Sequence, residues 1–145
     1  IRGNVDTRLR KIAERNAADG TILAAAGLRR LGISAWPGLE FRPIGPERMV
    51  PAVGQGAIAL QCRAADAAAL IPVLDAATGR ALSLERAIQA ALGAGCQTAL
   101  GVHASGDTLY LFHDDCGLRQ IPILPGDFDS PAAFADRVLS AAGLR

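Results

Sequence analysis

Three short apolar runs near the C-terminal end constrain the fold of this chain most strongly. They cover residues 98–104, 108–113 and 117–123, and each has the length and composition of a β-strand. Gly106-Asp107, between the first two runs, is typical of a hairpin turn. The three runs therefore predict a small antiparallel sheet.

Helical patterns flank this predicted sheet. Residues 66–76 and 82–93 precede it, and the second of these ranges carries an apolar stripe. A last helix is expected from about Ser130, a good N-cap with Pro131 behind it, to Ala142. The second half of the chain is thus expected to be an α+β domain, with helices on one face of a three-stranded antiparallel sheet.

The first 32 residues show a strand–helix–strand–helix pattern instead. Residues 1–5 resemble the end of a strand, and residues 6–17 can form a helix. Residues 21–25 form an apolar run suited to a buried parallel strand, and residues 26–31 a short helix. This order of elements is typical of part of an open α/β sheet.

A loop and a glycine-rich turn join the two halves. Residues 33–48 are rich in proline and glycine, and residues 50–63 combine a tight turn at Gly54-Gln55-Gly56 with a strand-like run. The turn is no dinucleotide fingerprint, because a third glycine is missing and no helix is expected after it. That strand would lack a partner, and the chain begins at Ile1 in mid-strand. We therefore expect an N-terminal part of the protein to be missing.

Composition excludes several classes of protein. The net charge is only +1, which does not favour a nucleic-acid partner, and no apolar run reaches the roughly 18 residues of a membrane span. An odd count of three cysteines, with no closely spaced pair, favours a reducing, cytoplasmic setting. The two histidines and the cysteines do not have the spacing of a zinc site, so no metal is expected.

Three arginines are candidate ligand-binding residues. Arg2, Arg8 and Arg30 lie at two successive strand-to-helix turns, where ligands of open α/β sheets bind. A guanidinium group is always charged and binds a carboxylate through two parallel hydrogen bonds. The alternative is that each is a solvated surface arginine.

Cys96 is a candidate attachment point. It follows Gly93-Ala94-Gly95, which leaves room near the sulfur. Because it follows the end of a helix rather than preceding one, no helix dipole lowers the pKa of its thiol. One-time attachment of a group is therefore favoured over repeated nucleophilic attack, with a buried structural cysteine as the alternative. With the arginines, Cys96 suggests a covalently tethered polyanion.

Four segments together resemble the hydroxymethylbilane synthase (porphobilinogen deaminase) family. They are RGNVDTRLRK (2–11), DGTILAAAGLRRLG (19–32), VPAVGQGAIALQCR (50–63) and, more loosely, ERAIQAALGAGCQTALG (85–101). They occur in the family's order and roughly its spacing. Two departures flank the cysteine: Ala94-Gly95-Cys96 stands where Gly-Gly-Cys is usual, and Thr98-Ala99-Leu100-Gly101 where Val-Pro-Ile-Gly is usual.

The resemblance implies a three-domain enzyme, with two α/β domains like those of periplasmic binding proteins and a small α+β domain. Residues 1–48 would be the later part of the second domain. Residues 49–64 would be the strand that crosses back to the first domain, which is missing here. Residues 65–145 would be the C-terminal domain that carries the cofactor cysteine.

The implied activity is that of a cytoplasmic, monomeric transferase of tetrapyrrole (haem) biosynthesis. It condenses four porphobilinogen molecules head to tail, with release of ammonia, on a dipyrromethane bound to Cys96 as a thioether. By resemblance, Arg2, Arg8 and Arg30 bind carboxylates, and Ala24, Gly27, Gln55 and Gly56 line the same cleft. The catalytic aspartate belongs to the first domain, so no catalytic residue is expected in this segment, and the segment alone should be inactive.

Two other functions remain open. A truncated or degenerate relative could be a non-catalytic module that binds polycarboxylates through its arginines. An unrelated thiol enzyme could use Cys96 as its nucleophile, but no partner base lies near it in the sequence.

Overall fold

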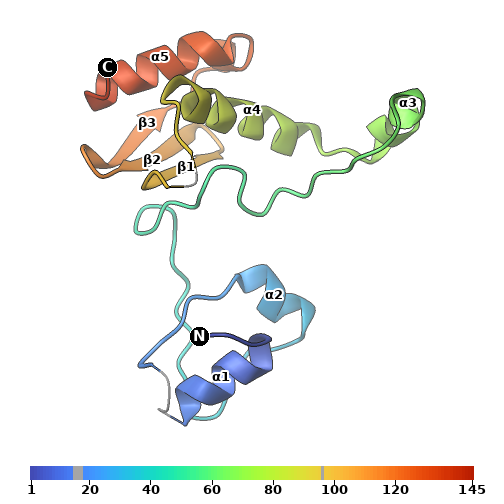
Figure 1. Cartoon of the computed structure of the whole chain (residues 1–145), viewed down its shortest axis with the longest axis vertical. Helices are drawn as coiled ribbons and strands as arrows, with labels where there is room; N and C mark the ends of the chain where they lie inside the picture. Colours follow the sequence, from blue (N-terminus) through green and yellow to red (C-terminus); the bar gives the residue numbers. More distant parts are fainter. Residues whose placement is uncertain (15–17, 96) are drawn as a thin grey trace. The chain divides into compact units, whose positions relative to one another are not determined.

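The structure, a computed structural model, describes residues 1–14, 18–95 and 97–145. The chain divides into two compact units, residues 1–44 and residues 45–145. Figure 1 labels the helices and strands of both.

A three-stranded antiparallel sheet forms the base of the second unit. Strands β1 (Leu100–Ser105), β2 (Thr108–His113) and β3 (Gly117–Pro122) follow one another in the order β1-β2-β3. Leu111 of β2 lies between Val102 of β1 and Arg119 of β3. The sheet predicted from the three apolar runs is confirmed, with strand ends shifted by one or two residues.

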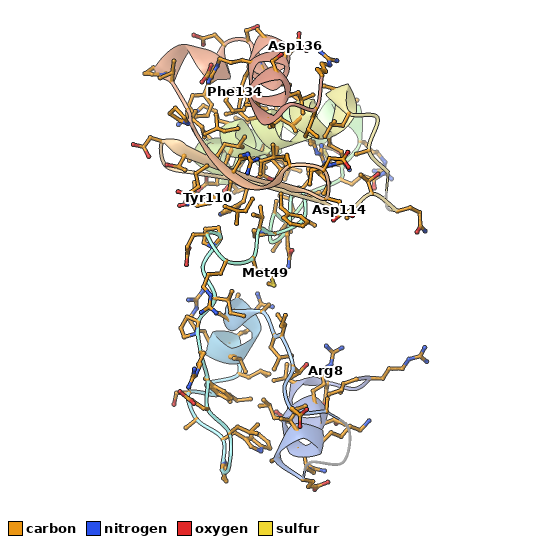
Figure 2. The ribbon with its side chains drawn as sticks, turned by 90° about the vertical axis from the view of Figure 1, so that its left-hand side faces the viewer. Arg8, Met49, Tyr110, Asp114, Phe134 and Asp136 are labelled. Carbon is orange, nitrogen blue, oxygen red and sulfur yellow. The ribbon has the colours of Figure 1, made fainter. Side chains whose placement is uncertain are left out.

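Two helices cover one face of this sheet. Helices α4 (Ala76–Ala91) and α5 (Pro131–Ala142) pack against each other, and α4 also runs along β1 (Figure 1). Phe134 of α5 lies on this side of the sheet, and Tyr110 of β2 lies on the opposite face (Figure 2). The fully buried large side chains of this unit are Leu84, Ile88, Val102, Leu109, Leu111, Phe134, Val138 and Leu139. The predicted arrangement, with helices on one face, is confirmed.

Short-range signals set the ends of these helices. The carboxylate of Asp75 accepts a hydrogen bond from the Thr78 N–H (2.7 Å), so α4 begins earlier than residue 82. Helix α5 has Pro131 in its first turn, as predicted, and ends at Gly143, which adopts φ +71°.

The helix predicted over residues 66–76 is broken into short turns. They are the 3₁₀ turn η1 (Ala64–Asp66), the single α-helical turn α3 (Ala67–Leu70) and the 3₁₀ turn η2 (Ile71–Val73). Pro72 explains the break, because proline has no N–H to donate and its ring clashes with the preceding helical turn.

The first unit contains two helices. Helix α1 (Val5–Ala13) begins at Asn4, whose side-chain oxygen accepts a hydrogen bond from the Thr7 N–H (2.9 Å). Leu9 and Ile12 form its buried face. Helix α2 (Ala25–Arg30) lies close to the predicted residues 26–31. The predicted continuation of α1 through residues 15–17 lies outside the described residues.

The strands predicted around these helices are not found. Residues 1–5, 21–25 and 57–63 form no strand, and the pairing in the described part of the first unit is a single bridge between Trp36 and Leu39. A parallel strand needs neighbouring strands to satisfy its backbone groups, and no described segment pairs with these three. In the described chain these three segments therefore have no strand partner, and their role as strands of a larger sheet stays a prediction.

Within the described ranges, no single helix is long and apolar enough to cross a membrane. Residues 64–73 and 76–91 reach the length and apolar composition of a membrane span only when they are taken together, and the two segments meet at a bend of 115°.

Candidate functional site

The start of α1 holds two of the three candidate arginines. The Nε–H of Arg8 donates to the Gly3 carbonyl (2.8 Å), and Lys11 Nζ donates to the Arg2 carbonyl (3.1 Å). Gly3 adopts φ +131°, and a Cβ there would lie 2.7 Å from a methyl carbon of Thr7. The residues before α1 are thus folded back on its first turn, which brings Arg2 and Arg8 to one end of the helix.

The third candidate, Arg30, is the last residue of α2. Ala24 is the N-cap of the same helix, and Gly27 lies in its first turn with open space where a Cβ would be. No hydrogen bond or ion pair in the described part of the first unit joins Arg30 to Arg2 or Arg8. None of the three arginines forms an ion pair with a described carboxylate. Their charges are therefore available to an anionic ligand.

The predicted turn at Gly54-Gln55-Gly56 belongs to the second unit and consists of two successive tight turns. The Gln55 N–H donates to the Ala52 carbonyl (3.0 Å), and the Ala57 N–H donates to the Gly54 carbonyl (3.1 Å). Gly54 adopts φ +70° and Gly56 φ +89°, values that other residues rarely adopt. The Gln55 side-chain oxygen accepts a further hydrogen bond, from the Ala52 N–H (3.1 Å).

A buried carboxylate, which the sequence analysis did not single out, binds this turn to the sheet. Glu85 of α4 is only 5% exposed. One of its oxygens accepts a hydrogen bond from the Gly54 N–H (2.8 Å), and the other from the Ala104 N–H (3.0 Å) of β1. Immediately before the turn, the Pro51 carbonyl accepts a hydrogen bond from the Val102 N–H (2.9 Å).

The turn, α4 and β1 enclose a pocket of about 280 Å³. Its polar lining comes from Gln55, Thr78, Glu85 and His103, and Gly56 contributes backbone. The ring nitrogen Nδ1 of His103 lies 3.5 Å from a Glu85 oxygen. The structure therefore brings Gln55 and Gly56 together with two titratable side chains in one pocket.

The candidate attachment point, Cys96, lies outside the described residues, but its neighbours are described. Gly93 ends α4 with φ +61°, and the Ala94 N–H donates to the Gln89 carbonyl (3.1 Å). A Cβ at Gly95 would meet no atom within 4 Å. The backbone therefore has open space at Gly95.

The remaining candidate ligands do not form a metal site. Among the described residues, no three histidine, cysteine or acidic side chains are grouped so that they could hold a metal ion. Cys62 is exposed, and Cys116 is half-buried with its thiol near the Gly117 carbonyl (3.4 Å).

Comparison with known proteins links these residues to one family. Residues 1–70 match the family model described as "Porphobilinogen deaminase, dipyromethane cofactor binding domain". The chain is 46% identical over 116 residues to the porphobilinogen deaminase of Roseiflexus sp. (strain RS-1), a match that covers 77% of this chain and 37% of that protein. It is 39% identical over 158 residues to the probable porphobilinogen deaminase of Hyperthermus butylicus, covering 97% of this chain and 50% of the relative. The chain thus spans half or less of the length of these relatives.

Proposed function

Because this chain belongs to the porphobilinogen deaminase family, we propose that it forms part of a hydroxymethylbilane synthase. One observation carries the proposal. The segment that matches the cofactor-binding domain, residues 1–70, contains the three candidate arginines, none of which forms an ion pair with a described carboxylate, together with the turn at Gly54-Gln55-Gly56. The reaction is the head-to-tail condensation of four porphobilinogen molecules with release of ammonia, which contributes to haem biosynthesis.

The residues fit a covalently bound dipyrromethane. Each pyrrole carries an acetate and a propionate, and unpaired guanidinium groups are the side chains best suited to bind such carboxylates. The open backbone beside Gly95 leaves room for a thioether at Cys96. When bound, the dipyrromethane supplies the pyrrole end to which porphobilinogen units are added.

The chain's own residues then have separate tasks. Arg2, Arg8 and Arg30 bind the carboxylates of the cofactor and of the pyrroles added to it. Ala24 and Gly27, which have no bulky side chains, leave space beside α2, and Gln55 and Gly56 line the pocket beside α4. Cys96 holds the cofactor. No residue of this chain is assigned to proton transfer, a task that we assign to an aspartate of another domain.

We also propose the domain organisation of a three-domain enzyme. Residues 1–48 are the later part of a periplasmic-binding-protein-like α/β domain, residues 49–64 a strand that crosses to another α/β domain, and residues 65–145 the C-terminal domain. Exposed apolar side chains support this proposal: Ile22 is 63% exposed and Ile58 is 82% exposed, each in a segment with the composition of a buried strand. Strands contributed by other domains would cover them.

The same proposal includes the setting in which the protein acts. We propose a monomer in the cytoplasm, where a reducing environment keeps the Cys96 thiol available for the cofactor. The near-neutral charge of the chain supports a small-molecule substrate, porphobilinogen, rather than a nucleic acid or a membrane surface.

Intact-mass measurement of the full-length gene product tests this function. The wild type and Cys62→Ala, a matched control at an exposed cysteine, should both carry the added mass of two linked pyrroles. Cys96→Ala should lack that mass. An unmodified Cys96 in well-folded wild-type protein would contradict the proposal and favour a non-catalytic polycarboxylate-binding module. Rapid alkylation of that free thiol by iodoacetamide would favour a thiol enzyme instead.

A further inference from the structure

We infer that Glu85 is a positioning residue for the proposed site. Its buried carboxylate fixes the turn at Gly54-Gln55-Gly56 and thereby holds Gln55 and Gly56 where they contact the pyrrole substrate. The inference rests on the proposed function for its last step. Its first step, the attachment of the turn, rests on the structure alone.

The contacts of Glu85 connect three parts of the second unit. Its backbone belongs to α4, one carboxylate oxygen binds the Ala104 N–H of β1, and the other binds the Gly54 N–H of the turn. The two distances, 3.0 and 2.8 Å, are those of good hydrogen bonds. The carboxylate is thus a bridge between backbone groups that lie 50 residues apart in the sequence.

A carboxylate suits this bridge because each of its two oxygens can accept one of the hydrogen bonds. Both of its oxygens accept hydrogen bonds, and bonds to a charged acceptor are stronger than those between neutral groups. A glutamine has the same shape but replaces one oxygen by an NH₂ group. In a Glu85→Gln variant, one of the two backbone N–H groups would therefore face another donor.

The turn depends on this bridge because its other described hydrogen bonds are local to residues 52–57, so that the Glu85 bond is what attaches it to α4. Gly54 and Gly56 both adopt positive φ, and glycine gains more conformational freedom than any other residue when it is released. The Gly54 hydrogen bond to Glu85 is the fixed point within the turn, while the Pro51–Val102 hydrogen bond holds the chain just before it. Loss of the Glu85 bond would therefore release Gln55 and Gly56 but leave Pro51 attached.

Cys96 and the arginines are not part of this bridge, so the consequences of releasing the turn can be separated. Glu85→Gln should retain the dipyrromethane mass at Cys96. The substrate would, however, meet a turn that has to be ordered on binding, which reduces affinity. We therefore expect the KM for porphobilinogen to rise by about 10-fold, with a smaller change in kcat.

The experiment compares Glu85→Gln with Glu47→Gln in the full-length gene product. Glu47 is exposed and lies in the same unit, so Glu47→Gln makes the same chemical change at a side chain that is not buried. Amide hydrogen exchange, followed by NMR, should be about 10-fold or more faster in Glu85→Gln at whichever of the Gly54 and Ala104 amides faces the NH₂ group, and unchanged at both in Glu47→Gln. Steady-state kinetics and intact mass are measured on the same samples.

Each result has a distinct meaning. Equal exchange rates in the two variants at both Gly54 and Ala104 would overturn the bridge. An unchanged KM despite faster exchange at Gly54 would overturn the positioning role. In the wild type alone, fast exchange at the Gly54 amide would also refute the bridge, so the inference can be tested even if Glu85→Gln fails to fold. A wild type without the dipyrromethane mass would refute the proposed function. The Gly54 exchange rates do not depend on that function, so a failure of the function and a failure of the bridge can be told apart.

Discussion

Gly101 in β1 allows a neighbouring segment to lie directly against the edge of the sheet, and replacing it by alanine should push that segment away. A Cβ at Gly101 would lie 2.8 Å from both the Cβ and the carbonyl oxygen of Val50, and 3.1 Å from a Val50 methyl carbon. No positive φ is involved at Gly101, so lack of space alone is expected to determine the effect.

The expected magnitude follows from these distances. Non-bonded carbon atoms are in optimal contact at about 3.5–4.0 Å, so the added methyl group overlaps Val50 by roughly 0.7 Å or more. The Val50 carbonyl is backbone and cannot rotate out of the way. Residues 50 and 51 would have to move, which disturbs the Val102 N–H to Pro51 carbonyl bond. Overpacking of this kind costs about 1–3 kcal/mol.

Amide hydrogen exchange at Val102 measures this cost locally. A loss of about 1–3 kcal/mol corresponds to exchange that is roughly 5- to 150-fold faster. The matched control is Gly79→Ala in α4, where the added Cβ meets no atom within 4 Å. That variant should leave Val102 exchange unchanged and stabilise the helix by about 0.5–1 kcal/mol. Equal Val102 exchange rates in the two variants would refute the steric argument.

Two further predictions concern the core and a helix cap of the second unit. Leu109→Ala should lower the free energy of unfolding by about 2–5 kcal/mol in urea denaturation, because Leu109 is fully buried. Val73→Ala, at a side chain 68% exposed, should change it by less than about 0.5 kcal/mol, and similar losses in the two variants would contradict the assigned core. The hydrogen bond from the Thr78 N–H lowers the pKa of Asp75 below its ordinary 3.8, so the stability it confers is fully present above about pH 3.8 and is lost as the pH falls through the lowered pKa. Urea denaturation at pH values between 5 and 2 should show the difference in stability between the wild type and Asp75→Ala shrinking as the pH falls, and a difference that does not change with pH would refute the prediction.

The antiparallel sheet could be predicted from the sequence because all its pairing is local. Residues 100–122 contain every partner, and the turn at Gly106-Asp107 fixes which residues face each other. Alternation of apolar side chains then places Leu109 and Leu111 on the covered face. The break in the helix predicted over residues 66–76 was a local signal too, because Pro72 is visible in the sequence, and the helical pattern was given too much weight against it.

The predicted strands of the first unit have no partner in this chain for the opposite reason. An apolar run such as residues 21–25 indicates that a segment is suited to burial, but its pairing depends on strands distant in the sequence. Glu85 was missed for a related reason. Helical periodicity marks the apolar face that includes Leu84 and Ile88, and a carboxylate beside that face gives no sign that its partner is Gly54, 31 residues away.

The attachment of the turn also affects how this domain behaves toward other molecules of its kind. Strand β1 is an outer strand, and such strands can recruit a strand from another molecule through their free N–H groups. On β1, the N–H groups of Val102 and Ala104 are already bound by the Pro51 carbonyl and the Glu85 carboxylate. At the opposite border, β3 ends in Pro122, which has no N–H. The contacts that fix the turn therefore also protect the sheet against strand-to-strand aggregation.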